Sequence, residues 1–385
     1  MPFSVYQRPI FAVSICVALL TQQASALVKL NDGTDRIYVT GSVGVTQDSN
    51  IFASSGGGSD YVYSGGLAVE YTRKAGWIAV NASVGVDISQ FDRFRGENFQ
   101  NPRFAAEFTK QTGRTTGALT LSAQRQSRAD AALNTRNTSW NYNAGLNVHY
   151  PIIERYSLSG GLGYSLIKYV DNPAFVDLAS YSANINLFYI LSNERDLFAG
   201  YRFRFSNSSR NTQDTDQAFN VGLSGRIIPR VNGTVSVGYQ VRTPSDGVGG
   251  ASYGSTTASA AVSYAFNKKT TLTGKVAKDF STTASDTSID VTTAGLDFQY
   301  AYSAKITFGA NTGYGNNRFL GRGGLIPGTG VHREDTSFDW GARVSYVYSQ
   351  HLQTNLSYSY MKNWSNAGSS DFERSSWSLG ASSRW

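Results

Sequence analysis

The stretch VNGTVSVGYQVR, from Val231 to Arg242, alternates strictly between two kinds of residue. Its odd positions are valines with one glycine and one tyrosine, whereas its even positions are polar apart from one glycine. Such period-two alternation predicts a β-strand with one apolar and one polar face. A soluble β-sandwich turns the apolar face inward, whereas a membrane barrel turns it toward lipid and encloses water. The rest of the chain has to decide between these two arrangements.

The same alternation recurs in 18 segments between Ile37 and Trp385, and the faces opposite the apolar ones are polar or tiny. A soluble barrel of this size needs some strands that are buried on both sides and read as continuous Val, Ile and Leu runs. A β-propeller needs them for its inner strands, and none occurs. No helical pattern supplies a second layer over one wet sheet. The pattern therefore predicts an all-β fold, a transmembrane up-and-down antiparallel β-barrel of about 18 strands.

The connections between these segments alternate between short and long. Residues 74–76, 229–230 and 349–350 are short connections, and residues 49–59, 126–136 and 317–333 are long ones. Outer-membrane barrels have this asymmetry, with short periplasmic turns and long extracellular loops. An even strand number then places both ends of the barrel on the periplasmic side. Pro102 is the awkward residue, because it falls within a predicted strand.

The N-terminal residues predict export across the inner membrane. Arg8 precedes an apolar run over residues 10–20, and Ala24-Ser25-Ala26 offers a cleavage site. The run is too short to span a bilayer as a helix. We expect a signal peptide over residues 1–26, a short periplasmic segment over 27–35 and the barrel over 36–385. Cys16, the one cysteine, lies in the signal peptide, so the mature barrel has no disulfide or thiol chemistry.

Composition and charge exclude several classes of function. Aromatic residues make up 13% of the chain and charged residues 16%, and the net charge of +7 is mild for 385 residues. No basic run points to nucleic acid. The three histidines, His149, His332 and His351, have no Ser and acid partners in an obvious triad. Ligands with metal-site spacing are also missing. We therefore expect no catalytic residues, no metal and no cofactor.

The inward-facing positions of the predicted strands name the candidate pore lining. Basic side chains outnumber acidic ones there, which favours anionic or neutral polar solutes, unless the charges pair across neighbouring strands. Arg202 and Arg204 on one strand are the strongest candidates for a selectivity patch. The loop over residues 317–333, with Arg322 and Arg333, is a candidate constriction, and its deletion should raise conductance. The pore-lining candidates are Arg202, Arg204, Arg242, Lys275, Arg343, Asp87, Glu107 and Asp339.

Two short segments resemble known outer-membrane barrels. Asp48, Ser49, Asn50, Ile51 and Phe52 follow the first predicted strand, and this run resembles the opening of the putative β-barrel porin 2 family. The aromatic C-terminal Trp385 is similar to the signal that barrel assembly machinery reads. The resemblance implies an integral protein of a Gram-negative outer membrane. It also implies a polysaccharide exit channel that works with a periplasmic polysaccharide-export protein.

Three functions stay open on the sequence alone. The first is an exit pore for a secreted polysaccharide, and the second is a general or substrate-selective diffusion porin for small polar or anionic solutes. The third is a structural or adhesive barrel that acts through its outer loops. Neighbouring glycosyltransferase genes would favour the first, liposome swelling with small sugars the second, and loop-dependent cell binding through a closed pore the third.

Overall fold

The computed structural model describes residues 26–31, 34–74, 76–170, 172–192, 194–245 and 252–385. The predicted signal peptide lies outside these residues except for its last position, Ala26. The described chain is almost entirely β-strand and turn, with three short 3₁₀ turns at Arg95–Glu97, Arg322–Gly324 and Gly368–Ser370. None of its helical turns has the length or apolar character needed to cross a bilayer.

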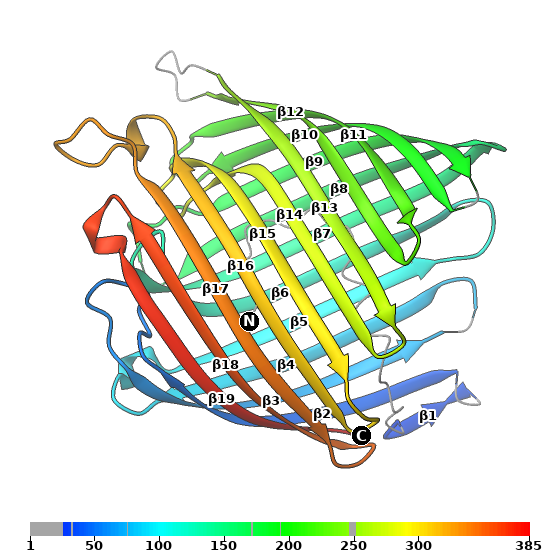
Figure 1. Cartoon of the computed structure of the whole chain (residues 1–385), viewed down its shortest axis with the longest axis horizontal. Coiled ribbons are helices and arrows are strands. Elements are labelled where there is room, and N and C mark those ends of the chain that lie inside the picture. Colours follow the sequence, from blue (N-terminus) through cyan, green and yellow to red (C-terminus); the bar gives the residue numbers. More distant parts are fainter. Residues whose placement is uncertain (1–25, 32–33, 75, 171, 193, 246–251) are drawn as a thin grey trace.

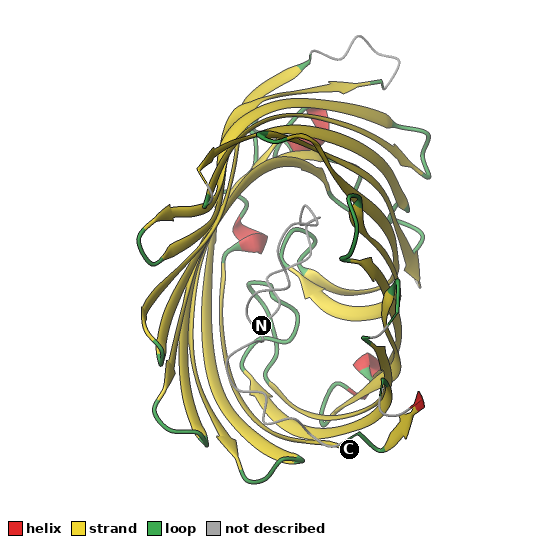
Figure 2. Ribbon diagram, turned by 90° about the vertical axis from the view of Figure 1, so that its right-hand side faces the viewer, coloured by secondary structure: helices red, strands yellow, loops and turns green. Residues whose placement is uncertain are grey.

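Strands β2 to β19 form one antiparallel sheet in which each strand pairs with the next (Figure 1). The sheet closes because β19 pairs with β2, from Ser376 opposite Asp48 to Arg384 opposite Thr40. Figure 2 shows the sheet curving round on itself. The predicted barrel of 18 strands is confirmed. The strands are β2 (Asp35–Asp48), β3 (Asp60–Arg73), β4 (Ala79–Phe91), β5 (Phe99–Lys110), β6 (Thr116–Asp130), β7 (Thr135–Ile153), β8 (Tyr156–Val170), β9 (Leu178–Ser192), β10 (Arg195–Ser208), β11 (Gln213–Ile228), β12 (Val231–Pro244), β13 (Tyr253–Asn267), β14 (Thr270–Thr282), β15 (Ser288–Ala301), β16 (Ile306–Phe319), β17 (Glu334–Val347), β18 (Leu352–Ser365) and β19 (Phe372–Arg384).

A short additional strand, β1 (Val28–Leu30), lies outside the ring and pairs with the start of β2. Its partners are the three residues from Asp35 to Ile37, just before the stretch of β2 that β19 covers. The backbone of Trp385 exchanges two hydrogen bonds with Val39, at 2.8 and 2.9 Å. β1 therefore continues along the edge of β2 where the closing strand ends.

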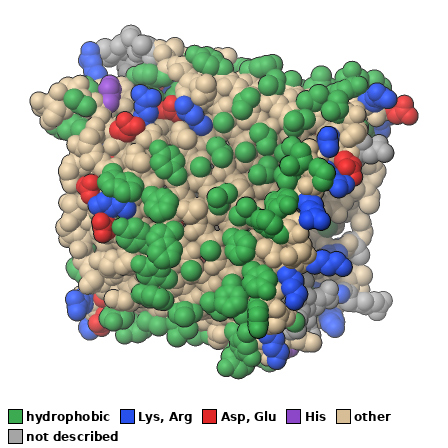
Figure 3. All heavy atoms as spheres, in the orientation of Figure 1, with side chains coloured by type: hydrophobic (Ala, Val, Ile, Leu, Met, Phe, Trp, Pro, Cys, Tyr) green, Lys and Arg blue, Asp and Glu red, His purple; other side chains and the backbone are tan. Residues whose placement is uncertain are grey.

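The opening stretch of sequence lies in β12 and shows that the sheet is inside out. Val237 and Tyr239 are 57% and 58% exposed on the outer face, whereas Gln240 and Arg242 are fully buried on the inner face. Large apolar side chains are exposed in the same way along the other strands, Val43, Leu162 and Leu379 among them. Figure 3 shows apolar side chains spread over the wall and charged ones mainly toward its margins. An apolar outer band of this kind faces lipid.

The two ends of the barrel differ as expected. Residues 154–155, 229–230 and 268–269 make tight turns at one end, whereas residues 49–59, 92–98 and 320–333 make long loops at the other. We call these the periplasmic and the extracellular end. The long loop expected over residues 126–136 is wrong, because β6 and β7 extend as a hairpin and leave only residues 131–134 between them. Both faces of this hairpin are polar, so it lacks the alternation that reveals a lipid-facing strand.

The structure accounts for Pro102. This residue pairs with Val86 of β4, but the register of β5 with β6 begins only at Arg103. Proline has no backbone N–H to donate. Because β5 has no β6 neighbour at Pro102, the proline costs no ladder hydrogen bond to β6.

Candidate functional site: the lumen and its covered mouth

Among the described strands, the barrel wall has two interruptions at its extracellular end. Pairing between β5 and β6 stops at Arg103 opposite Gln124, and pairing between β13 and β14 stops at Ala258 opposite Lys278. Beyond these points the end of β6 pairs only with β7, and the end of β14 pairs only with β15. Two hairpins, β6–β7 and β14–β15, are therefore free of one wall neighbour near the mouth and can follow another path.

The β6–β7 hairpin reaches the opposite wall. Ala132 at its tip packs against the inward-facing cluster of Ile289, Val291 and Phe319 on β15 and β16. β15 lies nine strands from β6 in a ring of eighteen, which is the far side of the barrel. The guanidinium of Arg333, the residue just before β17, donates hydrogen bonds to the carbonyls of Ala131 and Ala132 at 3.2 and 2.8 Å. The hairpin thus crosses the extracellular mouth and is held at its far end.

Arg136 holds the near arm of the same hairpin. Its guanidinium donates a hydrogen bond to the carbonyl of Ile51 at 3.2 Å and forms an ion pair with Glu97 at 3.1 Å. It also lies over the rings of Phe91 and Phe99, 4.8 and 5.8 Å from their centroids. Cation–π contacts of this kind stabilise a buried arginine. The hairpin is therefore fastened to both walls of the mouth.

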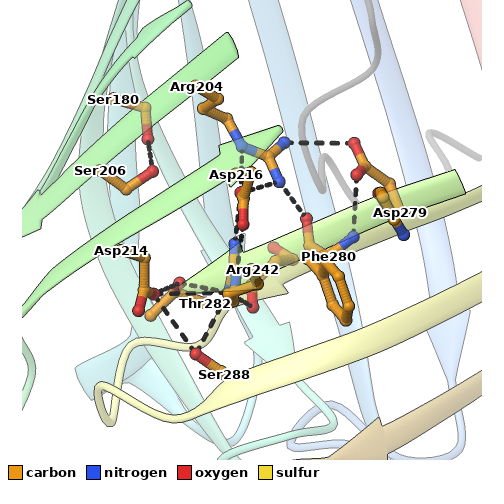
Figure 4. Close-up of polar contacts among 12 residues, drawn as sticks. Ser180, Arg204, Ser206, Asp214, Asp216, Arg242, Asp279, Phe280, Thr282 and Ser288 are labelled. Carbon is orange, nitrogen blue, oxygen red and sulfur yellow. Dashed lines mark hydrogen bonds and ion pairs between the residues drawn. The ribbon is translucent and has the colours of Figure 1, made fainter. Parts of the chain in front are cut away.

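A buried charge cluster occupies the inner face of β10, β11, β12 and β14 (Figure 4). Arg204 bonds the carboxylate of Asp216 (Nε to Oδ2, 2.7 Å), and Arg242 bonds it as well (Nε to Oδ1, 2.7 Å). Asp279 accepts from Arg202 at 2.7 and 2.9 Å and from Arg204 at 3.1 Å. The side chains of Arg204 and Arg242 are only 7% and 1% exposed. With Asp214 at 3.4 Å from Arg242, the cluster holds three arginines and three aspartates.

The two buried arginines also complete the free edge of β14. Arg204 donates to the carbonyl of Phe280 and Arg242 to that of Ser281, each at 2.7 Å (Figure 4). Both carbonyls lie on the part of β14 that has no β13 partner. Buried backbone acceptors need a donor, and the forked guanidinium can bond a carboxylate and a carbonyl together. These side chains therefore replace a missing strand neighbour.

The structure separates the candidate pore-lining residues into groups. Arg202, Arg204 and Arg242 meet in the charge cluster, whereas the others lie apart. Asp87 pairs with Arg103 at 3.0 Å, and Arg343 lies 3.8 Å from Asp297. Within the described chain, no ion pair is formed by Lys275, Glu107 or Asp339. Their role in lining a pore stays a prediction.

The candidate constriction loop, residues 317–333, is shorter than expected because β16 runs to Phe319. Its two arginines differ. Arg333 holds the β6–β7 hairpin and pairs with Asp335 at 2.6 Å. Arg322 is exposed, and its side chain forms no hydrogen bond or ion pair within the described residues. The β6–β7 hairpin thus enters the mouth with this loop beside it, and the tip of the β14–β15 hairpin also turns inward, because Ala284 accepts a hydrogen bond from the backbone of Val176 at 2.9 Å.

Sequence reasoning missed Asp214, Asp216 and Arg136. Asp214 and Asp216 are even-numbered positions of β11, as is Asn220, and therefore face inward. The register of β11 with β10 and β12 could have revealed them. Arg136 carried no such signal, because it lay in an expected loop.

The residues that resemble the family motif fasten the seam where the barrel closes. The buried Asp48 accepts hydrogen bonds from Arg374 of β19, at 2.5 to 3.1 Å, and from the backbone N–H of Asn50 at 3.0 Å. Asn50 donates to the carbonyl of Glu373 at 3.1 Å. Ser49 bonds the backbone of Ser375, Ile51 is fully buried, and Phe52 packs edge-on to Phe94. At the other end of the seam, Trp385 stacks on His351, with centroids 4.1 Å apart.

Comparison with known proteins agrees with this geometry. The family described as "Putative beta-barrel porin 2" matches residues 215–384. Similar solved structures include Pseudomonas aeruginosa OpdK with vanillate, which is 11% identical, with a TM-score of 0.50 over 91% of this chain and 99% of that one. P. aeruginosa OccK2 (OpdF) in complex with glucuronate is also 11% identical, with a TM-score of 0.50 over 91% and 97% of the two chains. A search of curated proteins gives no match.

The family description and the similar folds are those of porins and not of enzymes. No group of His, Cys, Asp and Glu in the described residues is arranged to hold a metal ion. The apolar outer band and the porin fold place the barrel in a Gram-negative outer membrane, surrounded by lipid. Residues 215–384 match the putative β-barrel porin 2 family, and the whole barrel has the fold of an outer-membrane porin.

Proposed function

We propose that this protein is a substrate-selective diffusion porin for small polar solutes. The observation that carries the proposal is a closed barrel with a polar inner face whose mouth is crossed by the β6–β7 hairpin. A barrel of 18 strands is wide enough for an aqueous channel. An element folded into that channel narrows it and so selects by size, because a solute must pass beside it.

Small solutes fit this arrangement better than a polymer does. A growing polysaccharide needs a continuous passage through the mouth, where the hairpin is fixed at Arg333 and Arg136. Two of the similar folds were solved with vanillate and with glucuronate, both small carboxylates. The comparisons give no support to polysaccharide exit, so a periplasmic polysaccharide-export protein is not needed by this proposal.

The charges on the inner wall favour weak charge selectivity. The buried cluster balances three arginines with three aspartates, and Arg103 and Arg343 each have an acidic neighbour. A field strong enough to select one sign of ion requires unpaired charge along the path. The proposed solutes are therefore polar and small, with little demand on their charge.

Reconstitution tests the proposal directly. Purified mature protein in planar bilayers should give discrete ionic conductance steps, and proteoliposomes should swell in isotonic solutions of monosaccharides. Large dextrans serve as the matched control, because they should give no swelling. Folded barrels without conductance or swelling would contradict the proposal and leave the adhesive barrel as the better explanation.

Barrel assembly machinery is the partner we propose for the closing strand. Trp385 completes the pairing of β19 with β2 through its two backbone bonds to Val39, and its exposed ring lies on the outside. Deleting Trp385 should lower the amount of folded protein in the outer membrane, whereas Trp385→Phe should preserve it. An equal level of all three proteins would contradict this role.

A further inference from the structure

A strip of aromatic rings lies on the inner wall near the periplasmic end. It consists of His149 on β7, Phe188 on β9 and Phe198 on β10. The ring centroids of His149 and Phe188 are 6.2 Å apart, and those of Phe188 and Phe198 are 5.2 Å apart. Their chain neighbours Val148, Leu187 and Leu197 are exposed on the lipid side. Since side chains alternate along a strand, the three rings face the lumen.

Phe198 lies flat because a glycine lies beneath it, and Phe188 is tilted from it by 35°, whereas His149 meets Phe188 edge-on at 70°. A Cβ atom on Gly222 would come within 2.6 Å of the ring of Phe198, so this ring lies across the wall of β11. Next to the rings, asparagine side chains also lie flat over glycines. Asn147 and Asn184 lie over Gly161, and Asn186 lies over Gly200, where a Cβ atom would be 2.0 to 2.8 Å from the amide oxygens. The two phenylalanine rings and the amides therefore form one low surface with His149 edge-on at its end, and we call these residues together the shelf.

The exposure of the shelf rings differs from that of three other inward-facing aromatic side chains. Phe91, Phe319 and Tyr38 are buried, and each lies under a guanidinium, of Arg136, Arg333 and Arg384 respectively. On the shelf, His149 is exposed and the two phenylalanines are half-buried, and none of the described residues places a guanidinium or ammonium group over these rings. Packing against glycine explains why Phe198 lies flat, but it does not explain an apolar strip left open to the lumen.

The polar groups around the rings indicate what could bind. Amide side chains donate and accept hydrogen bonds, as hydroxyl groups require. The basic neighbours are already engaged, because Arg202, opposite Asn184, is held by Asp279, and Arg226 pairs with Glu194 at 2.7 Å. Asp196, two residues before Phe198 on the same face, adds negative charge. The shelf therefore favours a neutral ligand over an anion.

We propose that the shelf is a binding site for neutral saccharides on the periplasmic side of the covered mouth. The C–H face of a sugar ring would lie on Phe188 and Phe198, as apolar groups do on aromatic faces, while its hydroxyls bond Asn147, Asn184 and Asn186. The site deepens the proposed porin function and rests on it. It would hold a sugar within the channel and so raise its rate of permeation at low concentration.

Single-channel recording with maltotriose as the probe tests the site. Added on the periplasmic side, maltotriose should interrupt the current of the native channel reversibly. In the double variant Phe188→Leu/Phe198→Leu, leucine keeps apolar contact with Gly222 but removes the ring faces, so the binding constant from the interruptions should fall about tenfold. The control Phe203→Leu changes a ring on the lipid side of β10, the strand that also carries Phe198, and should leave maltotriose binding unchanged.

The outcomes separate this inference from the function on which it rests. A channel that conducts and binds maltotriose equally well with and without the two rings overturns the saccharide site and leaves the porin intact. Glucuronate that interrupts the current more strongly than maltotriose overturns the assignment to neutral sugars. A native barrel that does not conduct contradicts the porin function itself. If the double variant does not fold, His149→Ala gives the same comparison at the exposed end of the strip.

Discussion

At the scale of single residues, Arg242 shows how the barrel tolerates a buried charge. It was expected in the pore lining because it occupies an inward-facing position of β12, and the alternation of the sequence is enough to predict which side chains face inward. Its partners depend on the gap between β13 and β14, which no local pattern reveals. The guanidinium bonds Asp216, the carbonyl of Ser281 and the hydroxyls of Thr282 and Ser288. Its function in the fold is thus to complete a strand edge.

Replacing this arginine should therefore destabilise the barrel. Arg242→Ala leaves Asp216 and the carbonyl of Ser281 buried without this donor, and we expect a loss of about 3–5 kcal/mol. The control Arg343→Ala removes a half-exposed pair 3.8 Å long, so its loss should stay below about 1 kcal/mol. Urea unfolding in lipid vesicles, followed by tryptophan fluorescence, measures both. Equal losses would show that burial of Arg242 carries no special cost.

At the scale of elements, the β6–β7 hairpin was the part that sequence could not place. Lipid-facing strands can be recognised in the sequence because one face must be apolar, as in β12 and β19. A hairpin in an aqueous mouth meets no such requirement, so residues 126–136 were interpreted as a polar loop. What fixes it is tertiary contact with β15, β16 and β17, from the opposite side of the ring.

Two arginines of one loop provide a matched test of this hairpin. Arg333→Ala removes both hydrogen bonds to its tip, so the hairpin should move more freely and the single-channel conductance should rise and become noisier. Arg322→Ala changes an exposed side chain nearby and should leave conductance unchanged. A rise of equal size in both variants would show that loop charge acts directly on the ions.

Removing the tip should have a larger effect on the same channel. Replacing residues 128–137 with a two-residue turn leaves the pairing of β5 with β6 intact, because that ladder ends at Gln124. We expect a folded barrel with a larger conductance and faster swelling in disaccharides, both measured against native protein. Deleting residues 320–333 should also raise conductance, since Arg333 is lost with them. An unchanged conductance in the tip variant would mean that the hairpin does not limit flow.

At the scale of the whole molecule, the paired charges of the inner wall determine how ions pass. A sequence count of inward bases and acids suggested a slightly positive lumen, but it could not show which of them neutralise each other. Arg103, Arg226 and Arg343 each have a carboxylate within 4 Å, and the cluster is balanced. Under a tenfold gradient of potassium chloride, the reversal potential should be small, with a permeability ratio within about threefold of one. A strongly anion-selective current would contradict this balance.

The seam between β2 and β19 has a consequence for how the barrel closes. Asp48, Ser49 and Asn50 lie at the end of the first wall strand, yet their partners Arg374, Glu373 and Ser375 lie on the last one. Until β19 pairs with β2, the carboxylate of Asp48 lacks its bond to Arg374 and the ring stays open. A chain that lacks β19 would therefore leave the edge of β2 unpaired, and an open sheet edge is not tolerated in lipid.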